Sequence, residues 1–507
     1  MDARVQPAAE AAAAFTSLVP DPRRRLMAFS FLMAGVFMAT LDNQIVSTAL
    51  PTIVGEFGEL ERFAWVGSAY LLAASAVMPV YGKLGDLFGR KYVMMAAIFL
   101  FTIGSLVCGL AGSMNQLIAA RVLQGLGGGG IMVSIFSINA DLFEPRVRAR
   151  YQSYSSLMLM AAGAVGPTLG GVLSDLFGWR SIFLVNLPVG IVVMTGLALI
   201  LPYRKPVRKP KIDFAGAILL AGAVASLVLW ADGRQLFGSL LSTGGIAVIA
   251  IGIACAVAWI FVERRVPEPI VPLPLFANPT FSLLLVVSLT SGAVGIGSVN
   301  YVALFLQTTT GLSPSHAGLL FMALTGGIAA GSLTAGRLIS MTGRYKIFAM
   351  ISTTGSTVTF LIYAQLHPGT PIPVIAALMV LQGLSVGFGQ QVPVVGVQNA
   401  SDPRDVGAAT GAVTLTRMAG ASIAISIYGA VLSGFVKAQD VAIPGIGNID
   451  ELTPAALAAL PPRSREMVAA IYANAFHPVF LSMAGLIAIG LVAAISLKNT
   501  RLPTIRA

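Results

Sequence analysis

Long apolar runs separated by short polar segments dominate this chain. A helix needs roughly 20 apolar residues to cross the hydrocarbon core of a membrane. Runs of that length recur along the whole sequence and predict an all-helical membrane protein with fourteen spans. The expected spans lie at about 27–50, 63–82, 92–112, 117–140, 151–175, 182–201, 214–231, 243–262, 282–307, 317–336, 348–366, 372–398, 408–434 and 475–497.

The composition agrees with a protein surrounded by lipid. Of the 507 residues, 56% are hydrophobic and only 10% are charged, and the mean hydropathy is +0.83. Soluble domains carry about 25% charged residues, so a surface covered by water is excluded. Cys108 and Cys255 both lie in apolar runs, which indicates no disulfide framework. Residues 1–26 lack the apolar core of a signal peptide and are expected to form a cytoplasmic segment.

The basic residues indicate the orientation. If both termini are cytoplasmic, 24 of the 32 lysines and arginines fall on the inner side and six on the outer side. Arg121 and Arg417 lie within spans. Such an excess predicts cytoplasmic N- and C-termini. The net charge of +11 is spread over many short loops, so nucleic acid is not an expected partner.

The sequence also repeats itself at long range. The polar loop GKLGDLFGRK at Gly82 has a weaker copy, GRLISMTGRYK, at Gly336. Two further pairs are RVLQGLGGG at 121 with MVLQGLSVG at 379, and EPRVRARYQSYSS at 144 with DPRDVGAATGAVT at 402. The offsets predict two related six-helix bundles. The expected parts are a cytoplasmic segment 1–26, a first bundle 27–201, two inserted helices with cytoplasmic loops 202–281, a second bundle 282–497 with an outer loop 435–474, and a cytoplasmic tail 498–507.

The loop at Gly82 resembles the helix 2–3 signature of the major facilitator superfamily. With two extra helices between the halves, the chain resembles the fourteen-spanner drug/proton antiporter branch of that family. The resemblance implies the major facilitator fold, in which two pseudo-symmetric six-helix bundles rock against each other to carry solutes.

Asp42 is the one carboxylate expected well inside a span. It lies fifteen residues into the first span, about 22 Å from its cytoplasmic end. A charge there costs roughly 2.5–3.5 kcal/mol even on insertion scales, so such a carboxylate usually faces a cavity and can exchange a proton. LDNQIVSTALP also resembles the family's helix 1 motif, whose aspartate is implicated in proton coupling. The alternative is a structural partner for a buried arginine.

Arg121 is the expected partner of Asp42, because the two side chains lie at matching depth. A positive neighbour would keep Asp42 deprotonated. RVLQGLGGG matches the family's helix 4 motif, and Gln124 lies one turn deeper on the same face. The alternative is an arginine that extends to the outer surface.

The stretch GAVGPTLGG places Gly166, Pro167, Gly170 and Gly171 in the fifth span. Proline removes a backbone hydrogen bond and glycine permits close helix contact, so either a pivot or plain packing follows. The stretch resembles the antiporter signature of proton-driven exporters, which implies export rather than uptake.

Six residues are expected to form a conformational latch at the cytoplasmic rim: Gly82, Asp86, Gly89, Arg90, Lys91 and Asp141. Asp86 could accept hydrogen bonds from a helix N-terminus, where a carboxylate is favoured. The resemblance implies that this partner is the start of the thirteenth span, near Gly407. Arg90 is expected to pair with Asp141. In the second copy Met341 stands approximately where Asp86 would align, so that half is expected to lack the latch. The alternative is a turn that only keeps the loops inside.

Polar side chains on span faces are expected to line a central substrate cavity. The predicted lining is Asn43, Gln44, Gln124, Asn300, Gln307, Gln390, Gln391, Thr414 and Arg417. The three histidines map near outer ends and are interpreted as interfacial. The segment LTPAALAALPPRSREMVAAIY in the outer loop is expected as a surface cover or as an amphipathic helix.

These features together predict a proton-coupled antiporter that exports hydrophobic or amphipathic compounds by alternating access. It would be a multidrug efflux protein of the cell membrane that supports antibiotic resistance, a secondary transporter and not an enzyme. No cofactor or metal is expected. The expected partners are a small hydrophobic substrate, protons and the lipid bilayer, with a periplasmic adaptor only if the host has an outer membrane.

Two other interpretations stay open. One is an exporter of a defined endogenous solute such as a lipid, siderophore or metabolite, for which Arg417 would suit an anionic group. The other is a membrane receptor or enzyme that transports nothing. The sequence contains no nucleotide-binding loop or metal-ligand cluster, which argues against the enzyme.

Overall fold

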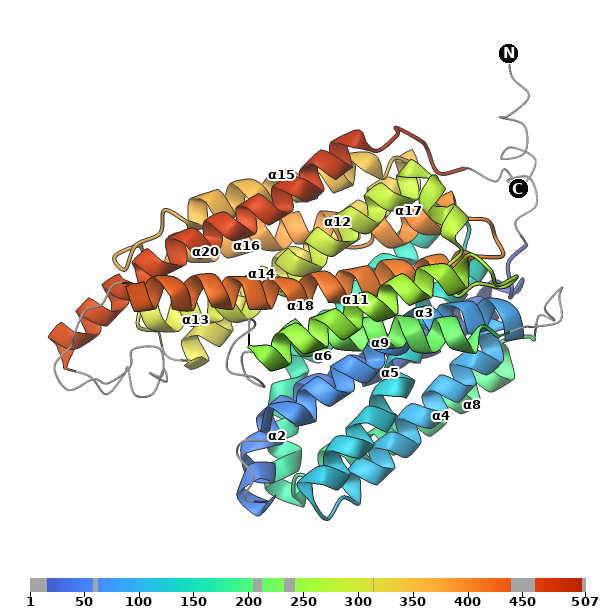
Figure 1. Cartoon of the computed structure of the whole chain (residues 1–507), viewed down its shortest axis with the longest axis horizontal. Helices are drawn as coiled ribbons and strands as arrows, with labels where there is room; N and C mark the ends of the chain where they lie inside the picture. The colour runs from blue at the N-terminus through green and yellow to red at the C-terminus, as the bar shows by residue number, and fades with distance from the viewer. Residues whose placement is uncertain are drawn as a thin grey trace.

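The computed structural model describes residues 16–57, 63–203, 212–231, 242–312, 314–438 and 461–503. These residues are helical throughout apart from short connections and one isolated backbone bridge between Arg344 and Arg501. The helices form two bundles that converge on the side of the chain termini and diverge away from it (Figure 1). We call the converging side the Asp86 end and the opposite side the Glu56 end.

The first bundle follows the first six expected spans in order. In this bundle α3 and α4 pack along α5, α2 packs along α6, and α8 lies against α2 and α4. The glycines of α5 explain its place between two neighbours, because a Cβ at Gly127 would overlap α4 and one at Gly129 would overlap α3. The helices are α2 (Pro22–Phe57), α3 (Phe63–Phe88), α4 (Arg90–Gly109), α5 (Met114–Leu142), α6 (Pro145–Phe177), α7 (Ser181–Leu184) and α8 (Asn186–Ile200).

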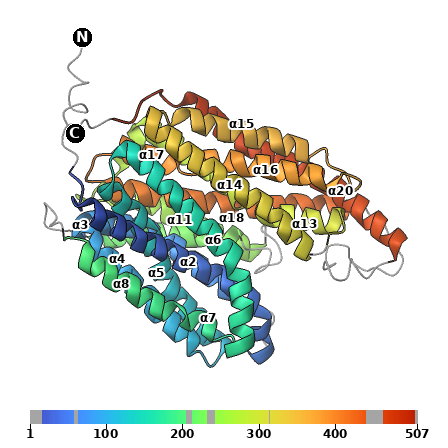
Figure 2. The ribbon, with the colours of Figure 1, turned by 180° about the vertical axis from the view of Figure 1, so that it is seen from behind.

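The second bundle contains the counterparts of these helices. Here α14 packs along α16, α12 along α18, and α15 along α20 and α16. Figure 2 shows α14 beside α6, a contact between the two bundles. The elements are the 3-10 helix η2 (Leu273–Ala277), α12 (Pro279–Gly295), α13 (Val299–Thr309), α14 (Pro314–Thr342), α15 (Lys346–Tyr363), α16 (Ile372–Gly389), α17 (Val392–Ala400), α18 (Val406–Ala438) and α20 (Pro462–Ser496).

Three expected spans are interrupted. The run 282–307 divides into α12 and α13 beside Gly295 and Gly297, and the run 372–398 divides into α16 and α17 after Gly389. The run 182–201 likewise divides at Val185 into α7 and α8. Apolar length alone predicted continuous helices in all three places. At the first two breaks, glycine weakens the helix interior and permits the interruption.

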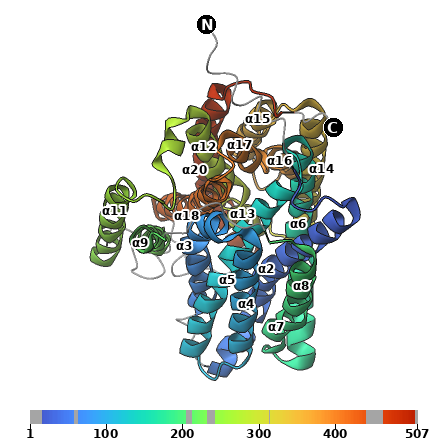
Figure 3. The same cartoon turned by 90° about the vertical axis from the view of Figure 1, so that its right-hand side faces the viewer.

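The two inserted helices are not equivalent. α9 (Phe214–Ala231) packs against α3 of the first bundle and α18 of the second, whereas α11 (Thr243–Glu263) packs along α9. Figure 3 shows α11 outermost, with α9 between it and the bundles. α9 therefore lies over the seam between the two halves.

Ten helical stretches of the described residues are long and apolar enough to cross a membrane, with α7 and α8 counted as one stretch and α16 and α17 as another; the bent α6 would be the eleventh. Phe214–Trp230 and Pro279–Gly295 form shorter apolar helices. This is a multi-pass membrane protein.

Helix extends into both ends of the expected outer loop 435–474. α18 continues to Ala438 and α20 already begins at Pro462. The stretch PRSREMVAAIY therefore forms the first turns of α20 rather than a separate surface helix, and residues 451–460 lie outside the described part of the chain.

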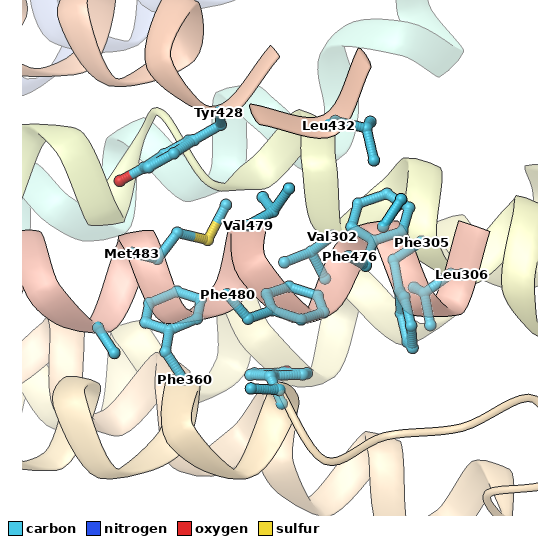
Figure 4. Close-up of a cluster of buried hydrophobic side chains, with 14 of the residues drawn as sticks. Val302, Phe305, Leu306, Phe360, Tyr428, Leu432, Phe476, Val479, Phe480 and Met483 are labelled. Carbon is cyan, nitrogen blue, oxygen red and sulfur yellow. The ribbon is translucent and has the colours of Figure 1, made fainter. Parts of the chain in front are cut away.

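An aromatic core fills the second bundle toward the Glu56 end. Phe305 of α13 contacts Phe476 and Phe480 of α20, with ring centroids 5.4 and 5.3 Å away. Figure 4 shows these rings with Phe360 and Met483. Such packing holds the broken α12–α13 segment against the long α20.

Candidate functional site

Asp86 joins the two bundles. Its Oδ1 accepts a hydrogen bond from the backbone N–H of Gly407 at 3.1 Å, and its Oδ2 accepts one from Ala408 at 3.0 Å. These are the free N–H groups at the start of α18, where the helix dipole favours a carboxylate. Gly82 lies against the carbonyl of Gly407, so a Cβ at either position would overlap the partner backbone. The contact is the one expected from the sequence.

Arg90 supports Asp86 from within the first bundle. Its Nη2 lies 3.2 Å from Asp86 Oδ1 and its Nη1 lies 2.8 Å from Asp141 Oδ1. Gly89 connects α3 to α4 with a φ of 92°, which glycine adopts readily. Lys91 differs from the expectation, because its Nζ donates to the carbonyl of Ala198 in the same bundle and does not bridge the halves.

Lys83 is a functional candidate that the sequence analysis missed. Its buried Nζ lies 3.0 Å from Glu268 Oε2, in the segment after α11, and 3.9 Å from Asp405 Oδ1 before α18. Burial raises the pKa of Asp405, and the nearby Lys83 partly offsets the rise. These residues line a cavity of about 830 Å³ at the Asp86 end. The linker of the inserted helices is thus tied to the same contact as Asp86.

The second loop copy makes a different contact. Gly343 has a φ of 70° and lies 254 residues after Gly89, so the aligned partner of Asp86 is Ser340. Met341, which the sequence placed there approximately, lies one residue further on and is 75% exposed, and Ser340 likewise provides no carboxylate. Gly336, the counterpart of Gly82, would meet the carbonyl of Ala149 in α6 at 2.9 Å if it carried a Cβ. Backbone packing is therefore repeated, and the carboxylate is not.

The chain beyond α20 fills this second junction. Leu502 is fully buried, and its N–H donates to the carbonyl of Gly343 at 2.8 Å. Arg146 of the first bundle donates from Nε to the carbonyl of Leu502 at 3.0 Å. Tyr345 and Thr500 are joined by a hydrogen bond of 3.0 Å. The tail thus supplies an acceptor where the second loop has no carboxylate.

Gln398 of α17 is the centre of a buried network between the bundles. Its Oε1 accepts from Gln152 at 3.2 Å and from Arg148 at 3.4 Å, both on α6. Its Nε2 donates to Thr410 of α18 at 3.0 Å. The sequence analysis missed Gln398, although an amide inside an apolar run was a usable signal. Together with Asp86 and Arg146, this network closes the Asp86 end.

Asp42 lies in a fully buried cluster inside the first bundle. Its Oδ2 accepts from Arg121 Nη1 at 2.6 Å, and its Oδ1 accepts from Gln124 Nε2 and Asn186 Nδ2, both at 2.7 Å. Gln124 also donates to Ser105 at 2.7 Å. The side chains of Asp42 and Arg121 are both 0% exposed. The cluster draws on α2, α4, α5 and α8, so four helices meet at one carboxylate.

Arg121 has contacts on a further helix. Its Nε donates to the carbonyl of Val66 in α3 at 3.0 Å, and its guanidinium lies 4.3 Å from the ring centre of Tyr70. The alternative of an arginine extended to the surface is wrong. The expected pair is present, but two expectations about it are not met. Asp42 faces no open cavity, and Gln124 belongs to the buried cluster rather than to a cavity wall.

Asn186 completes the cluster and was missed by the sequence analysis. It is the first residue of α8, directly after the break at Val185. The signal was an amide within the apolar run FLVNLPVG.

The glycine-rich part of α6 divides into packed and open positions. α6 bends by 45° between Pro145–Gly163 and Thr168–Phe177, around Gly166 and Pro167. A Cβ at Gly166 would lie 2.5 Å from the Cβ of Gln44 in α2, so this glycine permits close contact. Gly170 is buried, whereas a Cβ at Gly171 would meet nothing within 4 Å. Close packing at Gly171 was therefore an incorrect expectation.

The other expected cavity residues are spread over both bundles. Asn43 and Gln44 of α2 and Gln307 of α13 are half-buried, and the side chain of Asn300 lies outside the described residues. Thr414 is buried and donates to the carbonyl of Thr410 at 2.7 Å. Gln390 and Gln391 occupy the break between α16 and α17, where Arg417 also reaches.

At the Glu56 end, the contacts of Glu56 stay within the first bundle. Arg180 Nη2 lies 2.8 Å from Glu56 Oε1, and Trp179 Nε1 donates to Oε2 at 2.6 Å. The hydrogen bond from Arg180 lowers the pKa of this carboxyl, with a further contribution from Trp179. The pair joins α2 to the start of α7. Within the described residues, no group of His, Cys, Asp and Glu has the arrangement of a metal site.

Two helical bundles joined at one end, with a buried ion pair inside one of them, define a multi-pass membrane transporter. The Major Facilitator Superfamily profile matches residues 32–425, and the chain belongs to this family. Members of the family are transporters and not enzymes.

Curated relatives are about a third identical to the chain over the aligned residues. An uncharacterized MFS-type transporter of Mycobacterium tuberculosis is 33% identical over 497 residues, which cover 96% of this chain and 71% of the relative. Multidrug resistance protein 3 of Bacillus subtilis is 32% identical over 79% of this chain and 78% of the relative. Efflux pump dotC of Dothistroma septosporum is 30% identical over 93% of this chain and 84% of the relative.

Solved structures share the fold at lower identity. The human organic anion transporter MFSD10 (TETRAN) matches with a TM-score of 0.62 and 15% identity, over 94% of this chain and 100% of that chain. The proton:xylose symporter XylE matches with a TM-score of 0.63 and 13% identity, over 95% of this chain and 98% of that chain. These likenesses support the all-helical major facilitator fold.

Proposed function

We propose that this transporter is a proton-coupled antiporter that exports hydrophobic or amphipathic compounds by alternating access. The observation that carries the proposal is the Asp42–Arg121 pair, 0% exposed and 2.6 Å apart inside one bundle. A carboxylate at such a position is a group that a conformational change can switch between proton-free and proton-bound forms. Relatives named multidrug resistance protein and efflux pump support export.

The proposed topology has fourteen spans in a cell membrane, with both termini in the cytoplasm. Each interrupted helix pair counts as one span in this proposal, and the excess of basic residues on one side supports the orientation. The Asp86 end then faces the cytoplasm. The proton gradient drives the cycle with no cofactor, and a periplasmic adaptor is needed only in a host with an outer membrane.

In the proposed cycle, Arg121 controls the proton affinity of Asp42. While the 2.6 Å pair is intact, the cation stabilises the carboxylate and the proton stays off. When the helices around the pair shift, Asp42 loses its partner and takes up a proton from the outer side. Each proton that moves inward down 100 mV supplies about 2.3 kcal/mol. The bundles then rock, the proton leaves to the cytoplasm, and the substrate enters from that side.

The contacts at the Asp86 end act in this cycle as the cytoplasmic closure. Asp86, Arg90 and Asp141 hold the loop between α3 and α4 against the start of α18. Opening toward the cytoplasm requires this contact, the Gln398 network and the Arg146–Leu502 contact to separate together. We therefore assign Asp86 a conformational role and not a role in binding substrate.

Transport into inverted vesicles under an imposed pH gradient tests the proposal. Asp42→Asn keeps the size and hydrogen bonding of the side chain and removes the titratable group. We expect the variant to insert normally, to lose uptake driven by the pH gradient, and to retain exchange of an uncharged substrate. Uptake like that of the wild type would leave Asp42 as a structural partner of Arg121 and remove the proton-carrier assignment.

A second candidate is export of one defined endogenous solute, such as a lipid, siderophore or metabolite. The half-buried Arg417 favours this candidate if the solute is anionic. A panel of cationic, neutral and acidic compounds in a drug-sensitive host separates broad export from export of a single solute class.

A further inference from the structure

Arg417 lies on α18, a helix of the second bundle that also packs against α3 of the first. It follows the start of α18 by eleven residues, about 16 Å along the helix. Its Nη2 donates to the carbonyl of Gln390 at 2.6 Å, in the break between α16 and α17. The next residue, Gln391, donates from Nε2 to Ser156 of α6 at 2.9 Å. The guanidinium therefore binds the residue that directly precedes a contact between the two bundles.

The backbone of Arg417 is held in place. Gly292 of α12 packs against its carbonyl so closely that a Cβ on Gly292 would overlap it. The side chain thus extends from a fixed point on two tightly packed helices, α12 and α18. This contact restrains the backbone of Arg417, and the hydrogen bond from Nη2 to Gln390 restrains the side chain, so less conformational entropy is lost when an anion binds.

Arg121, Arg148 and Arg417, which are buried or half-buried among the helices, differ in their partners. Arg121 is neutralised by Asp42. Arg148 donates a hydrogen bond from each of its three side-chain nitrogens, to the carbonyls of Phe143 and Ala140 and to Oε1 of Gln398. Arg417 makes one hydrogen bond to a carbonyl, and the described part of the chain places no carboxylate within 4 Å of it. Within the described residues, the N–H groups of Nε and Nη1 donate no hydrogen bond, and the side chain is only half-buried.

We propose that Arg417 binds the anionic group of a transported compound. The inference rests on the proposed export through the space between the bundles and names the substrate class. A guanidinium presents parallel N–H donors that match a carboxylate or a sulfonate. A cation inside a membrane protein is normally balanced by an anion, and a substrate supplies that anion here. The compound is an amphipathic organic anion.

Two amide oxygens next to Arg417 define a further feature of the ligand. The Oε1 atoms of Gln390 and Gln391 are buried and accept no hydrogen bond within the described residues. They offer acceptors in the same break between α16 and α17 that Arg417 reaches, so an anion that also carries a hydroxyl or an amide N–H fits better than a plain one. The membrane potential, negative inside, favours export of such an anion and import of the proton in the same cycle.

The test compares pyrene-1-sulfonate with ethidium in inverted vesicles under a pH gradient. The sulfonate stays ionised at every pH used, so its charge does not follow the gradient. Arg417→Gln is expected to raise the KM for the sulfonate at least tenfold and to leave ethidium uptake within twofold of wild type. Arg417→Lys keeps the charge but not the paired donors. Its KM for the sulfonate is expected to lie between those of the wild type and Arg417→Gln. The control Arg337→Gln removes an exposed arginine of α14 and should change neither substrate.

Equal losses for both substrates in Arg417→Gln would overturn the proposal and indicate a structural role. Unchanged sulfonate uptake would overturn it as well. A binding measurement on the wild-type protein keeps the test valid if the variant does not fold or if no transport is driven by the pH gradient. Pyrene-1-sulfonate should raise the thermal unfolding temperature of the purified wild type, and pyrene-1-sulfonamide should not. Equal effects of the two compounds would exclude an anion site.

Discussion

The cores of the two bundles arise from a repeated sequence but hold different chemistry. Arg121 and Gln124 of α5 align with Met379 and Gln382 of α16. In the first bundle, Gln124 contacts the ion pair of Asp42 and Arg121. In the second bundle, Met379 is fully buried in an apolar core, and neither amide atom of Gln382 has a partner within the described residues.

This difference assigns separate tasks to the two halves. Among the described residues, a carboxylate lies in the core of the first bundle and none lies in the core of the second, so the proposed proton exchange at Asp42 would belong to the first bundle. The second bundle replaces charge with stacked rings such as Phe476 and Phe480, 5.6 Å apart. Its core is suited to acting as a rigid wall that carries Arg417. The duplication therefore kept the fold in both halves and the ion pair in one.

Removal of Arg121 should have the largest effect. Arg121→Ala leaves Asp42 buried without a cation, and breaking a buried pair costs about 3–5 kcal/mol. Coupled transport should fall as well, because the cation that stabilises the Asp42 carboxylate in the proposed cycle is removed. Thermal unfolding and pH-driven uptake measure the two effects. Coupled uptake at the wild-type rate would contradict the assigned role of the pair.

A charge placed in the second core should come next in size. Met379→Arg puts a cation at the position aligned with Arg121, where Met379 is 0% exposed. The expected cost is about 2.5–3.5 kcal/mol, because the second core offers no aligned carboxylate. Met379→Leu is the matched control and should cost less than about 1.5 kcal/mol. If Met379→Arg unfolds like the wild type, the second core contains a partner for the charge and the comparison fails.

The two loop copies should also respond unequally. Asp86→Asn removes a charge at the start of α18 that contributes about 0.3–1 kcal/mol, together with the ion pair to Arg90. We expect transport to slow several-fold while the substrate Kd changes less than twofold. The aligned Ser340→Ala should leave both quantities unchanged. A Kd that rises in parallel with the lost rate would show that Asp86 contributes to binding.

The contact of the tail should have a smaller effect. Arg146→Gln removes the hydrogen bond to the carbonyl of Leu502, worth about 1 kcal/mol. Closure at the Asp86 end should weaken, and a cysteine introduced at Ser340 should react faster with a thiol reagent added from that side. Arg337→Gln on the exposed face of α14 is the control. No change in labelling would show that the tail contact does not support closure.

The smallest effect is expected at Glu56. Its pKa is lowered by Arg180 and Trp179, so its contribution to stability is complete above its usual pKa of 4.5 and is lost as the pH falls through the lowered value. Thermal unfolding should therefore show a small deficit for Glu56→Gln at pH 7, and the deficit should shrink in acid. A difference that is constant with pH would exclude the ionised pair as its cause.

Features that depend on local pattern were accessible from the sequence. The apolar runs predicted helices near their observed positions, since every backbone group in lipid must be satisfied within its own helix. The contact of Asp86 with the start of α18 was implied by the family resemblance of one loop motif, and the sequence also suggested the pairing of Arg90 with Asp141. The pairing of Asp42 with Arg121 followed from depth along two helices.

Other features were set by contacts between distant parts of the chain. Asn186 meets Asp42 across 144 residues, Lys83 meets Glu268 across 185, and Arg146 meets Leu502 across 356. Periodicity and motif spacing do not specify which distant side chains converge, so these partners were missed. The breaks beside Gly297 and Gly389 were also missed, because glycine permits a break and packing decides whether it occurs.

The sequence by itself determined a multi-pass helical protein, a duplication, and the residue types of the ion pair and of the loop contact. Hydrophobic length, the cost of a charge in lipid and helix-end electrostatics act over one helix or one turn, and the sequence states them directly. The tertiary structure alone decided that the ion pair is fully buried and that α9 packs over the seam between the bundles. It also decided that the Arg417 side chain makes a single hydrogen bond within the described residues. Those outcomes depend on how helices from both halves pack around each side chain, because burial and pairing are properties of the assembled bundles.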